Sequence, residues 1–326
     1  MNYRKSFFQR QNLGSVKLLF LSGFFLMFLL VGSAKAYTIE NYQENVEDRF
    51  VISPVNLELT LSPGQTTTQQ ITIVNRLGKT VNFGITKEDF VGSSDPEKVT
   101  EFLGDESAGI TSAKDWVTPD VDEIALNHGD RLTVQLTITA PQNAVAGSHY
   151  VAVFASATGE EQDQGNGKVR LVSRVGTLIL INVPGNNQES GEITHFSADK
   201  NFYRQGPVEF STVFKNSGNI YEKVKGEIAI KNILGTEVAR FPLKDWTVLS
   251  NSSRKQNATW NQKWLMGRYT AELTTVYGFG GNLKNTKSIV FYAFPWHIAL
   301  LLLLLLIVIY YLFKYFFSKF EIRKKS

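Results

Sequence analysis

The side chains that could do acid–base or metal chemistry are scattered along the chain. None of the histidines belongs to a zinc-binding H-E-x-x-H motif or to an i, i+4 pair. They are His128, His149, His195 and His297. The sequence also lacks the G-x-S-x-G turn of serine hydrolases and the phosphate-binding G-x-x-x-x-G-K-[ST] loop. We therefore expect no catalytic residue, no metal ligand, no cofactor and no enzymatic activity.

Two groups of carboxylates are candidates for a catalytic pair, because glycosidases use two acids that only the fold brings together. The groups are Asp120, Asp122 and Glu123, and Glu160, Glu161 and Asp163. Neither has the D-x-[DN]-x-[DN]-G spacing of a calcium-binding EF-hand loop. We interpret both as solvated edges and keep two alternatives. One is calcium binding, and the other is a carbohydrate-active enzyme, which requires a carboxylate pair about 5 to 9.5 Å apart in a cleft.

The absence of cysteine and the distribution of charge limit the function classes. No Cys occurs in 326 residues, which excludes disulfides, thiolate metal sites and a cysteine nucleophile. Exported domains without disulfides must be held by their apolar cores, which favours a bacterial surface. The chain has a net charge of +4, but residues 37–293 carry 24 Lys plus Arg against 29 Asp plus Glu, a net −5. Because the basic excess lies at the two ends, we expect no nucleic-acid partner.

The first 36 residues have the order of a secretory signal peptide. Basic residues precede the apolar run from Leu18 to Val31, and Ala34-Lys35-Ala36 offers a small-x-small cleavage site. Cleavage after Ala36 would leave Tyr37 as the mature N-terminus. An uncleaved anchor is the alternative, and it would leave the middle of the chain exported as well.

Residues 294–313 predict a single transmembrane helix. The run from Ile298 to Ile309 is wholly apolar, and about twenty residues at ~1.5 Å each match the ~30 Å hydrocarbon core of a bilayer. Candidate anchors at the two membrane surfaces are Trp296, Tyr310, Tyr311 and Lys314. By the positive-inside rule the basic tail, residues 314–326, is cytoplasmic, so the preceding domains face outward. We therefore expect a single-pass protein of the cell membrane with extracellular domains.

Residues 49–184 alternate apolar and polar side chains, as strands with one buried face do. The alternation from Phe50 to Leu61 predicts one strand, and Ser62-Pro63-Gly64-Gln65 predicts the turn after it. Similar strands recur at short intervals up to Val183, which is typical of a β-sandwich. Residues 37–48 are polar and predict a flexible spacer.

A second sandwich is predicted over residues 192–293. Pro184-Gly185-Asn186-Asn187 marks the start of a linker, residues 185–191, because the apolar pattern stops there. Strand-like runs follow up to Phe291, and no helical period appears between Asp48 and Ala293. The predicted fold class is all-β: two immunoglobulin-like β-sandwiches in tandem, with an N-terminal signal peptide and one C-terminal transmembrane helix.

Four side chains are candidate contacts with a partner. The stretch Gly92–Lys114 interrupts the alternation and predicts a long inserted loop, which is either a binding element or mobile. Its apolar residues include Phe102 and Leu103. In the second sandwich, Trp264 lies in a polar segment and Phe279 lies among glycines. Large exposed apolar side chains in such places are typical of binding surfaces.

Several segments resemble the first extracellular domain of the WxL-interacting surface proteins. They are Val51 to Leu61 with its Pro-Gly turn, the strand ending Ile73-Val74-Asn75, and Pro141 to Phe154. The resemblance implies an immunoglobulin-like domain associated with peptidoglycan and a second one implicated in host or partner binding. It also implies one membrane span with a basic tail, and no catalytic residues.

These observations predict a membrane-anchored surface protein whose immunoglobulin-like domains contact peptidoglycan or another surface protein. An alternative from a different class is a chaperone-like assembly factor for exported proteins. Two-domain pilus chaperones, which offer a free strand edge to a client, are the pattern for this alternative. A carbohydrate-active enzyme is the third hypothesis.

Overall fold

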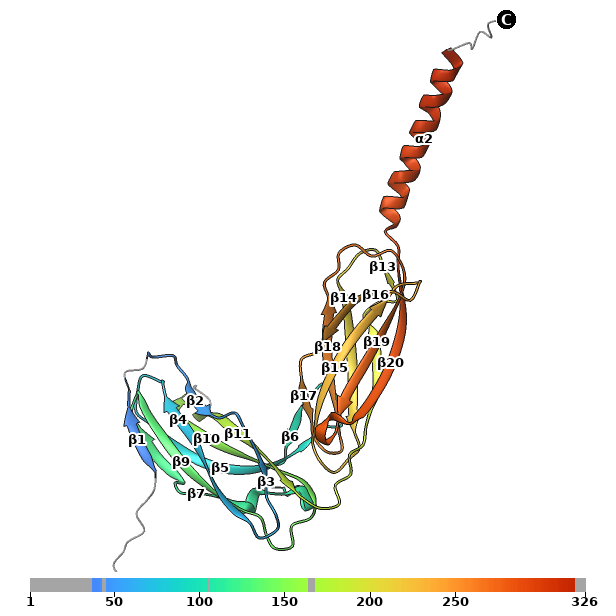
Figure 1. The fold of residues 1–326 in the computed structure, drawn as a ribbon. Coiled ribbons are helices and arrows are strands. Elements are labelled where there is room, and N and C mark those ends of the chain that lie inside the picture. Colours follow the sequence, from blue (N-terminus) through green and yellow to red (C-terminus); the bar gives the residue numbers. More distant parts are fainter. Residues whose placement is uncertain (1–36, 43–44, 105, 164–167, 320–326) are drawn as a thin grey trace, which may run out of the picture.

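The structure is a computed structural model that describes residues 37–42, 45–104, 106–163 and 168–319. The predicted signal peptide and the end of the basic tail, residues 320–326, lie outside the described residues. Figure 1 shows two β-sandwiches that meet at an angle. A single long helix, α2 (Trp296–Lys319), extends from the far end of the second sandwich.

The first sandwich consists of two sheets. One sheet orders β1 (Thr38–Asn41), β9 (Asp130–Thr139), β4 (Thr66–Asn75) and β2 (Phe50–Ser53), with β7 (Val117–Pro119) also paired to β9. The other orders β3 (Asn56–Thr60), β11 (Lys168–Val183), β10 (Gly147–Asp163), β5 (Val81–Gly92) and β6 (Thr100–Phe102), with β8 (Glu123–Leu126) also paired to β5.

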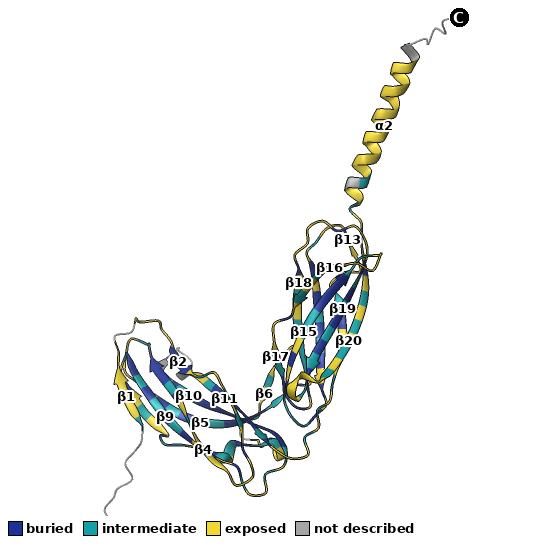
Figure 2. Ribbon diagram, in the orientation of Figure 1, coloured by how far each residue is buried: buried dark blue, intermediate teal, exposed yellow. Residues whose placement is uncertain are grey.

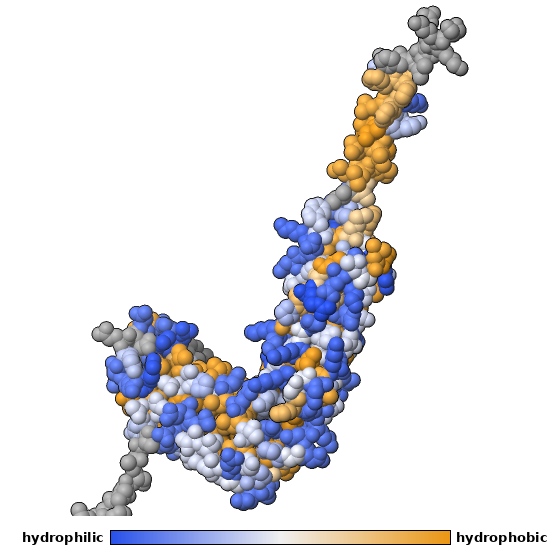
Figure 3. All heavy atoms as spheres, in the orientation of Figure 1, coloured by the Kyte–Doolittle hydropathy of each residue, from blue (hydrophilic) through white to orange (hydrophobic). Residues whose placement is uncertain are grey.

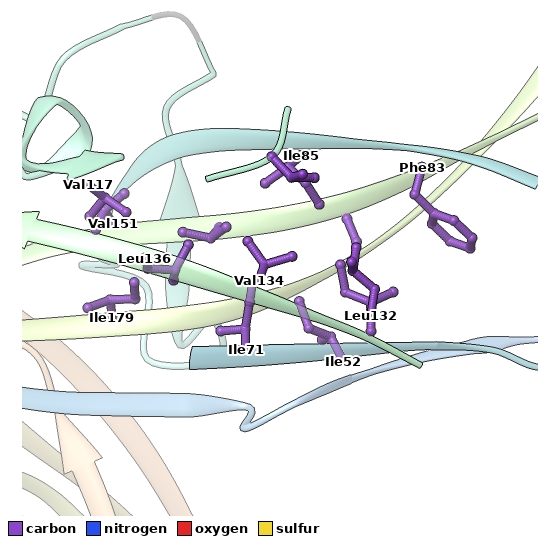
Figure 4. Packing of buried hydrophobic residues seen from close by; sticks show 14 of the residues in the cluster. Ile52, Ile71, Phe83, Ile85, Val117, Leu132, Val134, Leu136, Val151 and Ile179 are labelled. Atoms are coloured by element: carbon purple, nitrogen blue, oxygen red, sulfur yellow. The ribbon is translucent and has the colours of Figure 1, made fainter. Parts of the chain in front are cut away.

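The alternating pattern places every second side chain of these strands between the two sheets. Figure 4 shows the result, with Ile71 and Val134 from one sheet facing Val151 and Ile179 from the other. All four side chains are fully buried. Burial of this apolar area is the main force that holds a sandwich without disulfides together.

The stretch predicted as a flexible spacer, residues 37–48, contains a strand. Its residues Thr38–Asn41 form β1, which pairs antiparallel with β9. The side chains of β1 are exposed, so the pairing comes from the backbone ladder rather than from an apolar face. Asn41 adds a side-chain bond, donating from Nδ2 to Asp130 Oδ1 at 2.6 Å. A strand without a buried face leaves no alternating hydrophobic pattern, which is why the spacer prediction was wrong there.

The single strand predicted from Phe50 to Leu61 is two strands in different sheets. β2 pairs antiparallel with β4, whereas β3 pairs parallel with β11. The chain changes sheets at the cis Ser53–Pro54 peptide bond. The inward positions shift from even-numbered residues in β2 to odd-numbered residues in β3, and the exposed apolar side chain of Val55 between them makes the run look continuous in the sequence.

The second sandwich repeats the architecture. One sheet orders β12 (Gly191–Ala198), β14 (Val208–Asn216) and β18 (Ser252–Trp260). The other orders β13 (Phe202–Tyr203), β20 (Leu283–Ala293), β19 (Gly267–Tyr277), β15 (Glu222–Lys231) and β16 (Glu237–Pro242), with β17 (Trp246–Val248) also paired to β15. Phe291 is central to its core, with ring centroids 5.5 Å from Tyr203 and Tyr269 and 6.4 Å from Trp260. The expected pair of immunoglobulin-like sandwiches is confirmed.

Glu222, at the start of β15, has a buried carboxyl group. We expect this burial to make the stability of the protein depend on pH. Its Oε2 accepts a hydrogen bond from the Gly278 N–H at 2.9 Å, and its Oε1 has no partner among the described residues. Burial raises the pKa of the Glu222 carboxyl above its usual value; the Gly278 N–H opposes this effect and Glu189 adds to it. An acid whose pKa is raised by folding costs stability once the pH exceeds that pKa.

The variant E222Q should therefore have a higher Tm than the parent protein at neutral pH, because it removes the buried charge and keeps an acceptor for Gly278. The advantage should disappear as the pH falls below the pKa of an unfolded glutamate, about 4.3, where both states of the parent are protonated. Thermal unfolding of both proteins across this pH range is the measurement. A difference in Tm that does not change with pH would contradict the assignment.

Candidate binding edge of the first sandwich

The outer edge of β11 is only partly covered. β11 pairs with β10 along its whole length on one side. On its other side β3 pairs only with residues from Leu178 to Asn182. The part of β11 that precedes Leu178 therefore extends beyond its neighbour on that side.

The unpaired backbone groups on this edge can be identified from the hydrogen bonds to β3. The Leu178 N–H donates to the Val55 carbonyl at 2.9 Å, and the Asn182 carbonyl accepts from the Leu61 N–H at 3.0 Å. Even-numbered residues of β11 thus face β3. Since backbone groups alternate between the two sides of a strand, the N–H and C=O groups of three further residues face the same way: Val172, Arg174 and Gly176. Within the described ranges, no backbone hydrogen bond reaches them.

The corresponding edge of the second sandwich is also only partly paired. There the last strand, β20, is paired with β13 only at Tyr292 and Ala293. Two side chains of β20 also bond to β12, in the opposite sheet. Asn285 Nδ2 donates to the Gly191 carbonyl at 2.6 Å, and Lys287 Nζ donates to the Thr194 carbonyl at 2.8 Å.

Another outer strand carries the features that usually prevent strand addition. On β16, Arg240 bonds Glu237 at 2.6 Å and Glu227 at 2.5 Å, and Pro242 ends the strand. The edge of β11 differs, because the described residues Val172 and Val175 are exposed apolar side chains there, 57% and 38% exposed.

A pocket of about 440 Å³ opens beside the free edge of β11. Half of its lining residues are apolar, and two of these, Phe50 and Val81, are also part of the sandwich core. The full lining is Asp48, Arg49, Phe50, Leu77, Lys79, Val81, Ala157, Ser173, Arg174 and Val175. Inward-facing side chains of a strand added at this edge would point toward an apolar space that is already formed.

Arg174 holds the free part of β11 against the outer face of its sheet. Its Nη1 lies 2.7 Å from Glu88 Oε2, and its guanidinium lies 4.3 Å from the ring centroid of Phe154 and 5.8 Å from that of Phe102. Glu88 in turn accepts a hydrogen bond from the Gly104 N–H at 2.7 Å. The contacts of Arg174 and Glu88 therefore hold this part of the strand in place, and they do not involve its outward backbone N–H and C=O groups.

Gly176 is required where β11 passes the Phe154 ring. A Cβ at this position would lie 2.6 Å from Phe154 Cδ1. The variant G176A should therefore displace that ring and cost about 1 to 3 kcal/mol of stability, as overpacking does. The matched control is G84A in β5, where a Cβ meets nothing within 4 Å. Chemical denaturation of both variants is the measurement, and equal stabilities would contradict the packing described here.

The stretch Gly92–Lys114, expected as a binding or mobile loop, is bonded to the first sandwich through Asp89. The carboxylate of this fully buried residue accepts hydrogen bonds from the Ser112 hydroxyl at 2.5 Å, the Ala113 N–H at 3.1 Å and the Lys114 N–H at 2.9 Å. A buried carboxylate with several donors fixes the backbone that supplies them.

The first part of the same stretch also contacts the second sandwich. The Ser253 N–H donates to the Ser93 carbonyl at 3.1 Å, and the Lys255 N–H donates to the Pro96 carbonyl at 2.9 Å. Lys255 Nζ lies 2.6 Å from Glu97 Oε1. These bonds give the stretch a structural role in the joint between the sandwiches.

An apolar cluster at the joint contains residues of both sandwiches. Phe90, Tyr150 and Leu180 of the first pack with Leu249 of the second. The Tyr150 hydroxyl donates to Ser250 Oγ and accepts from the Ser250 N–H, both at 3.0 Å. Burial raises the pKa of Tyr150, so the hydroxyl keeps the proton that it donates. The joint is therefore packed and hydrogen-bonded like a small core.

The predicted partner contacts lie in separate places. Phe102 packs on Phe154, with ring centroids 5.3 Å apart, and is close to Arg174 on the outer face of the β11 sheet. Leu103 is half-buried beside it. Trp264 and Phe279 are exposed at opposite ends of the second sandwich. Their contact roles stay predictions, and only Phe102 and Leu103 are near the β11 edge.

The polar side chains considered for chemistry are also apart. His128 accepts from the Gly78 N–H at 3.2 Å, His149 packs on Trp116 with ring centroids 4.4 Å apart, and His195 bonds Ser197 at 2.8 Å. Among Asp120, Asp122 and Glu123, Asp120 accepts from the Gln135 N–H at 3.0 Å. In the part of the chain that the structure describes, no group of three His, Cys, Asp or Glu could hold a metal ion. The side chains of Glu160, Glu161 and Asp163 are not described.

The predicted transmembrane segment, residues 294–313, is helical from Trp296 onward and continues to Lys319. Phe294 and Pro295 precede the helix. Among the described residues α2 is the one helix long and apolar enough to cross a membrane. Trp296 is at its start, and Tyr310, Tyr311 and Lys314 are in its second half. Figure 2 shows that the helix is exposed along its length.

The free edge of β11 was not predicted from the sequence. Its strands were predicted, but whether a strand has a neighbour depends on which segments pair in space.

Comparison with known proteins gives structural matches only. No family model matches the chain, and no curated protein does. The Class 5 fimbriae chaperone CfaA is 12% identical with a TM-score of 0.39, over 76% of this chain and 100% of that chain. The Pseudomonas aeruginosa CupB2 chaperone is 8% identical with a TM-score of 0.35, over 74% and 100%. A chain of the CsuC-CsuE chaperone–tip adhesion subunit complex of Acinetobacter baumannii is 13% identical with a TM-score of 0.34, over 76% and 99%.

These findings correct two expectations. The resemblance to WxL-interacting surface proteins is wrong, because no family model matches and the matched structures are fimbrial chaperones. The Pro-Gly turns and alternating strands that suggested it recur in unrelated sandwiches. The predicted function, a surface protein that contacts peptidoglycan or another surface protein, is contradicted by the same matches. At 8–13% identity the matches transfer no residue roles to this chain.

Proposed function

We propose that this protein is a chaperone-like assembly factor that holds an exported polypeptide by strand addition to the free edge of β11. The observation that carries the proposal is the row of outward backbone groups of Val172, Arg174 and Gly176, which continues the edge that β3 occupies. In strand addition, main-chain hydrogen bonds supply affinity, and pockets for alternate side chains supply specificity.

The pocket beside the edge supports selection of an apolar client strand. Its apolar side chains include Phe50, Leu77 and Val81, and the charged residues Arg49 and Lys79 also line it. An alternating client strand would point every second side chain toward this pocket. The client class is therefore a polypeptide with an unpaired, alternating apolar strand, such as a sandwich domain that lacks one strand. Holding such a client requires no catalytic group.

The localisation is part of the proposal. α2 is long and apolar enough to cross a membrane, and five basic residues but one acidic residue follow Phe313. The positive-inside rule then assigns the tail to the cytoplasm and both sandwiches to the exported side. A client would meet the β11 edge as it emerges from the same membrane.

Binding of short synthetic peptides to the full chain in detergent tests the proposal. The probe is a fluorescent peptide of alternating valine and threonine, and its control is the same peptide with every second amide N-methylated. The methylated peptide has the same side chains but cannot complete the backbone ladder. We expect saturable binding of the first peptide only, with protection of the β11 edge.

A functional readout accompanies the binding assay. The full chain should suppress aggregation of a β-sandwich domain from which the final strand has been deleted, and the unlabelled valine–threonine peptide should compete with that effect. Equal binding of both peptides would indicate unspecific apolar contact. That result, or suppression without competition, would contradict strand addition.

A further inference from the structure

The end of the second sandwich that joins α2 has an exposed apolar surface. Its residues come from the β15–β16 turn, the β18–β19 loop, β13 and the end of β20. Leu234 is 85%, Met266 is 74% and Trp264 is 67% exposed. The set, called here the junction surface, is Phe202, Ile233, Leu234, Trp264, Met266 and Tyr292. In Figure 3 hydrophobic atoms continue from the helix onto this end of the sandwich.

The strand register gathers these segments at one end. Ala293, the last residue of β20, is paired with Gly267 on one side and with Tyr203 on the other. The loop that contains Trp264 and Met266 directly precedes Gly267. Lys231, at the end of β15, is paired with Thr270 of β19, so the turn with Ile233 and Leu234 projects from the same end.

The junction surface is held close to the start of α2. Only Phe294 and Pro295 separate β20 from the helix, and the backbone of Phe294 is bonded to the sandwich. The Phe294 N–H donates to the Tyr203 carbonyl at 2.9 Å. The Arg204 guanidinium lies 4.7 Å from the centroid of the Trp296 ring. The membrane-crossing window of α2 begins at Ala299, so the sandwich end cannot move far from the bilayer surface.

Basic side chains lie at the same end of the sandwich, and one of them, Lys200, pairs with Asp199 at 3.4 Å. Lys200, Arg204, Lys263 and Arg268 are exposed at this end of the sandwich. Apolar and aromatic side chains together with Lys and Arg are the composition that favours the headgroup region of a membrane.

We propose that the junction surface lies in the lipid headgroup region of the membrane that α2 crosses, and that it fixes the tilt of the second sandwich. The inference rests on α2 being a membrane span but not on the identity of a client. Because the joint between the sandwiches is packed, a fixed tilt of the second sandwich also fixes the height of the β11 edge above the membrane.

Single-cysteine labelling tests the inference, since the chain has no native Cys. An environment-sensitive fluorophore is attached to L234C, W264C, L305C or F279C in the full chain, reconstituted in phosphatidylcholine–phosphatidylglycerol nanodiscs. Leu305 lies within α2 and reports the span. Phe279 is the matched control, because it is 88% exposed and its N–H bonds Glu189 Oε1 at 2.6 Å, at the end of the sandwich away from α2.

The labels at 234 and 264 should have blue-shifted emission and be quenched by headgroup-level nitroxide lipids, while the label at 279 should be quenched only by an aqueous quencher. Aqueous quenching at all three positions would overturn the inference. Protection at 234 and 264 without quenching by lipid nitroxides would assign the surface to a protein or a second copy, and would also overturn it. If the label at position 305 did not lie in the acyl region of the bilayer, α2 would not be a membrane span. Peptide binding at the β11 edge would be unaffected by that result.

Discussion

Replacing Val172 with proline should lower the affinity for the valine–threonine peptide by about tenfold or more, because it removes an outward N–H donor from the free edge and adds a ring in the path of the client. A single backbone hydrogen bond contributes only about 1 kcal/mol, so the steric effect of the ring is included in this expectation. Proline is tolerated on a strand edge where its missing N–H would face solvent. The fold should therefore be retained, and fluorescence anisotropy titration is the measurement.

The matched variant V172T separates backbone from side-chain effects. Threonine keeps the N–H and the β-branched shape, so the affinity should remain close to that of the parent protein. Circular dichroism and Tm of V172P show whether the sandwich is intact. Unchanged affinity of a folded V172P would mean that clients do not pair with the outward groups of β11.

Replacing Tyr150 with alanine should cost about 3 to 5 kcal/mol, as removal of a large buried ring does, and should separate the unfolding of the two sandwiches. The side chain is 1% exposed and contributes both apolar contacts and the two bonds to Ser250. We expect two thermal transitions in place of one coupled transition, and a broader distribution of sandwich angles in small-angle scattering.

Y150F is the control for the packing effect. It keeps the ring but leaves the Ser250 N–H without its acceptor, which should cost about 1 to 3 kcal/mol with the angle retained. A single transition and an unchanged scattering profile for Y150A would show that the joint does not depend on this cluster. Peptide affinity should be similar in both variants, because the β11 edge belongs to the first sandwich alone.

Much of the fold could be predicted because its strands bury one face. The alternation at Val81 to Ile85 and at Arg131 to Thr139 falls within β5 and β9. The errors come from features that leave no such pattern. The side chains of β1 are all exposed, and the change of sheets near Pro54 shifts the inward positions by one residue while Val55 keeps the run apolar.

The candidate site was harder to predict, because an open edge is defined by a missing neighbour. Pairing of β3 with the end of β11 joins residues more than a hundred positions apart, and nothing local in either segment specifies its extent. The same holds for Asp89, whose sequence neighbours give no sign that its carboxylate orders residues Ser112 to Lys114. The apolar C-terminal run is the opposite case, because composition alone indicates a helix of this length.

Amide hydrogen exchange along β11 tests strand addition most directly. In the free protein the amides of Val172, Arg174 and Gly176 should exchange fast, while those of Ser173, Val175 and Thr177, which face β10, should be protected. Addition of the valine–threonine peptide should slow the first set and leave the second unchanged, and the N-methylated peptide should have no effect. Equal protection of both sets in the free protein, or no change on adding peptide at saturating concentration, would contradict the proposed function.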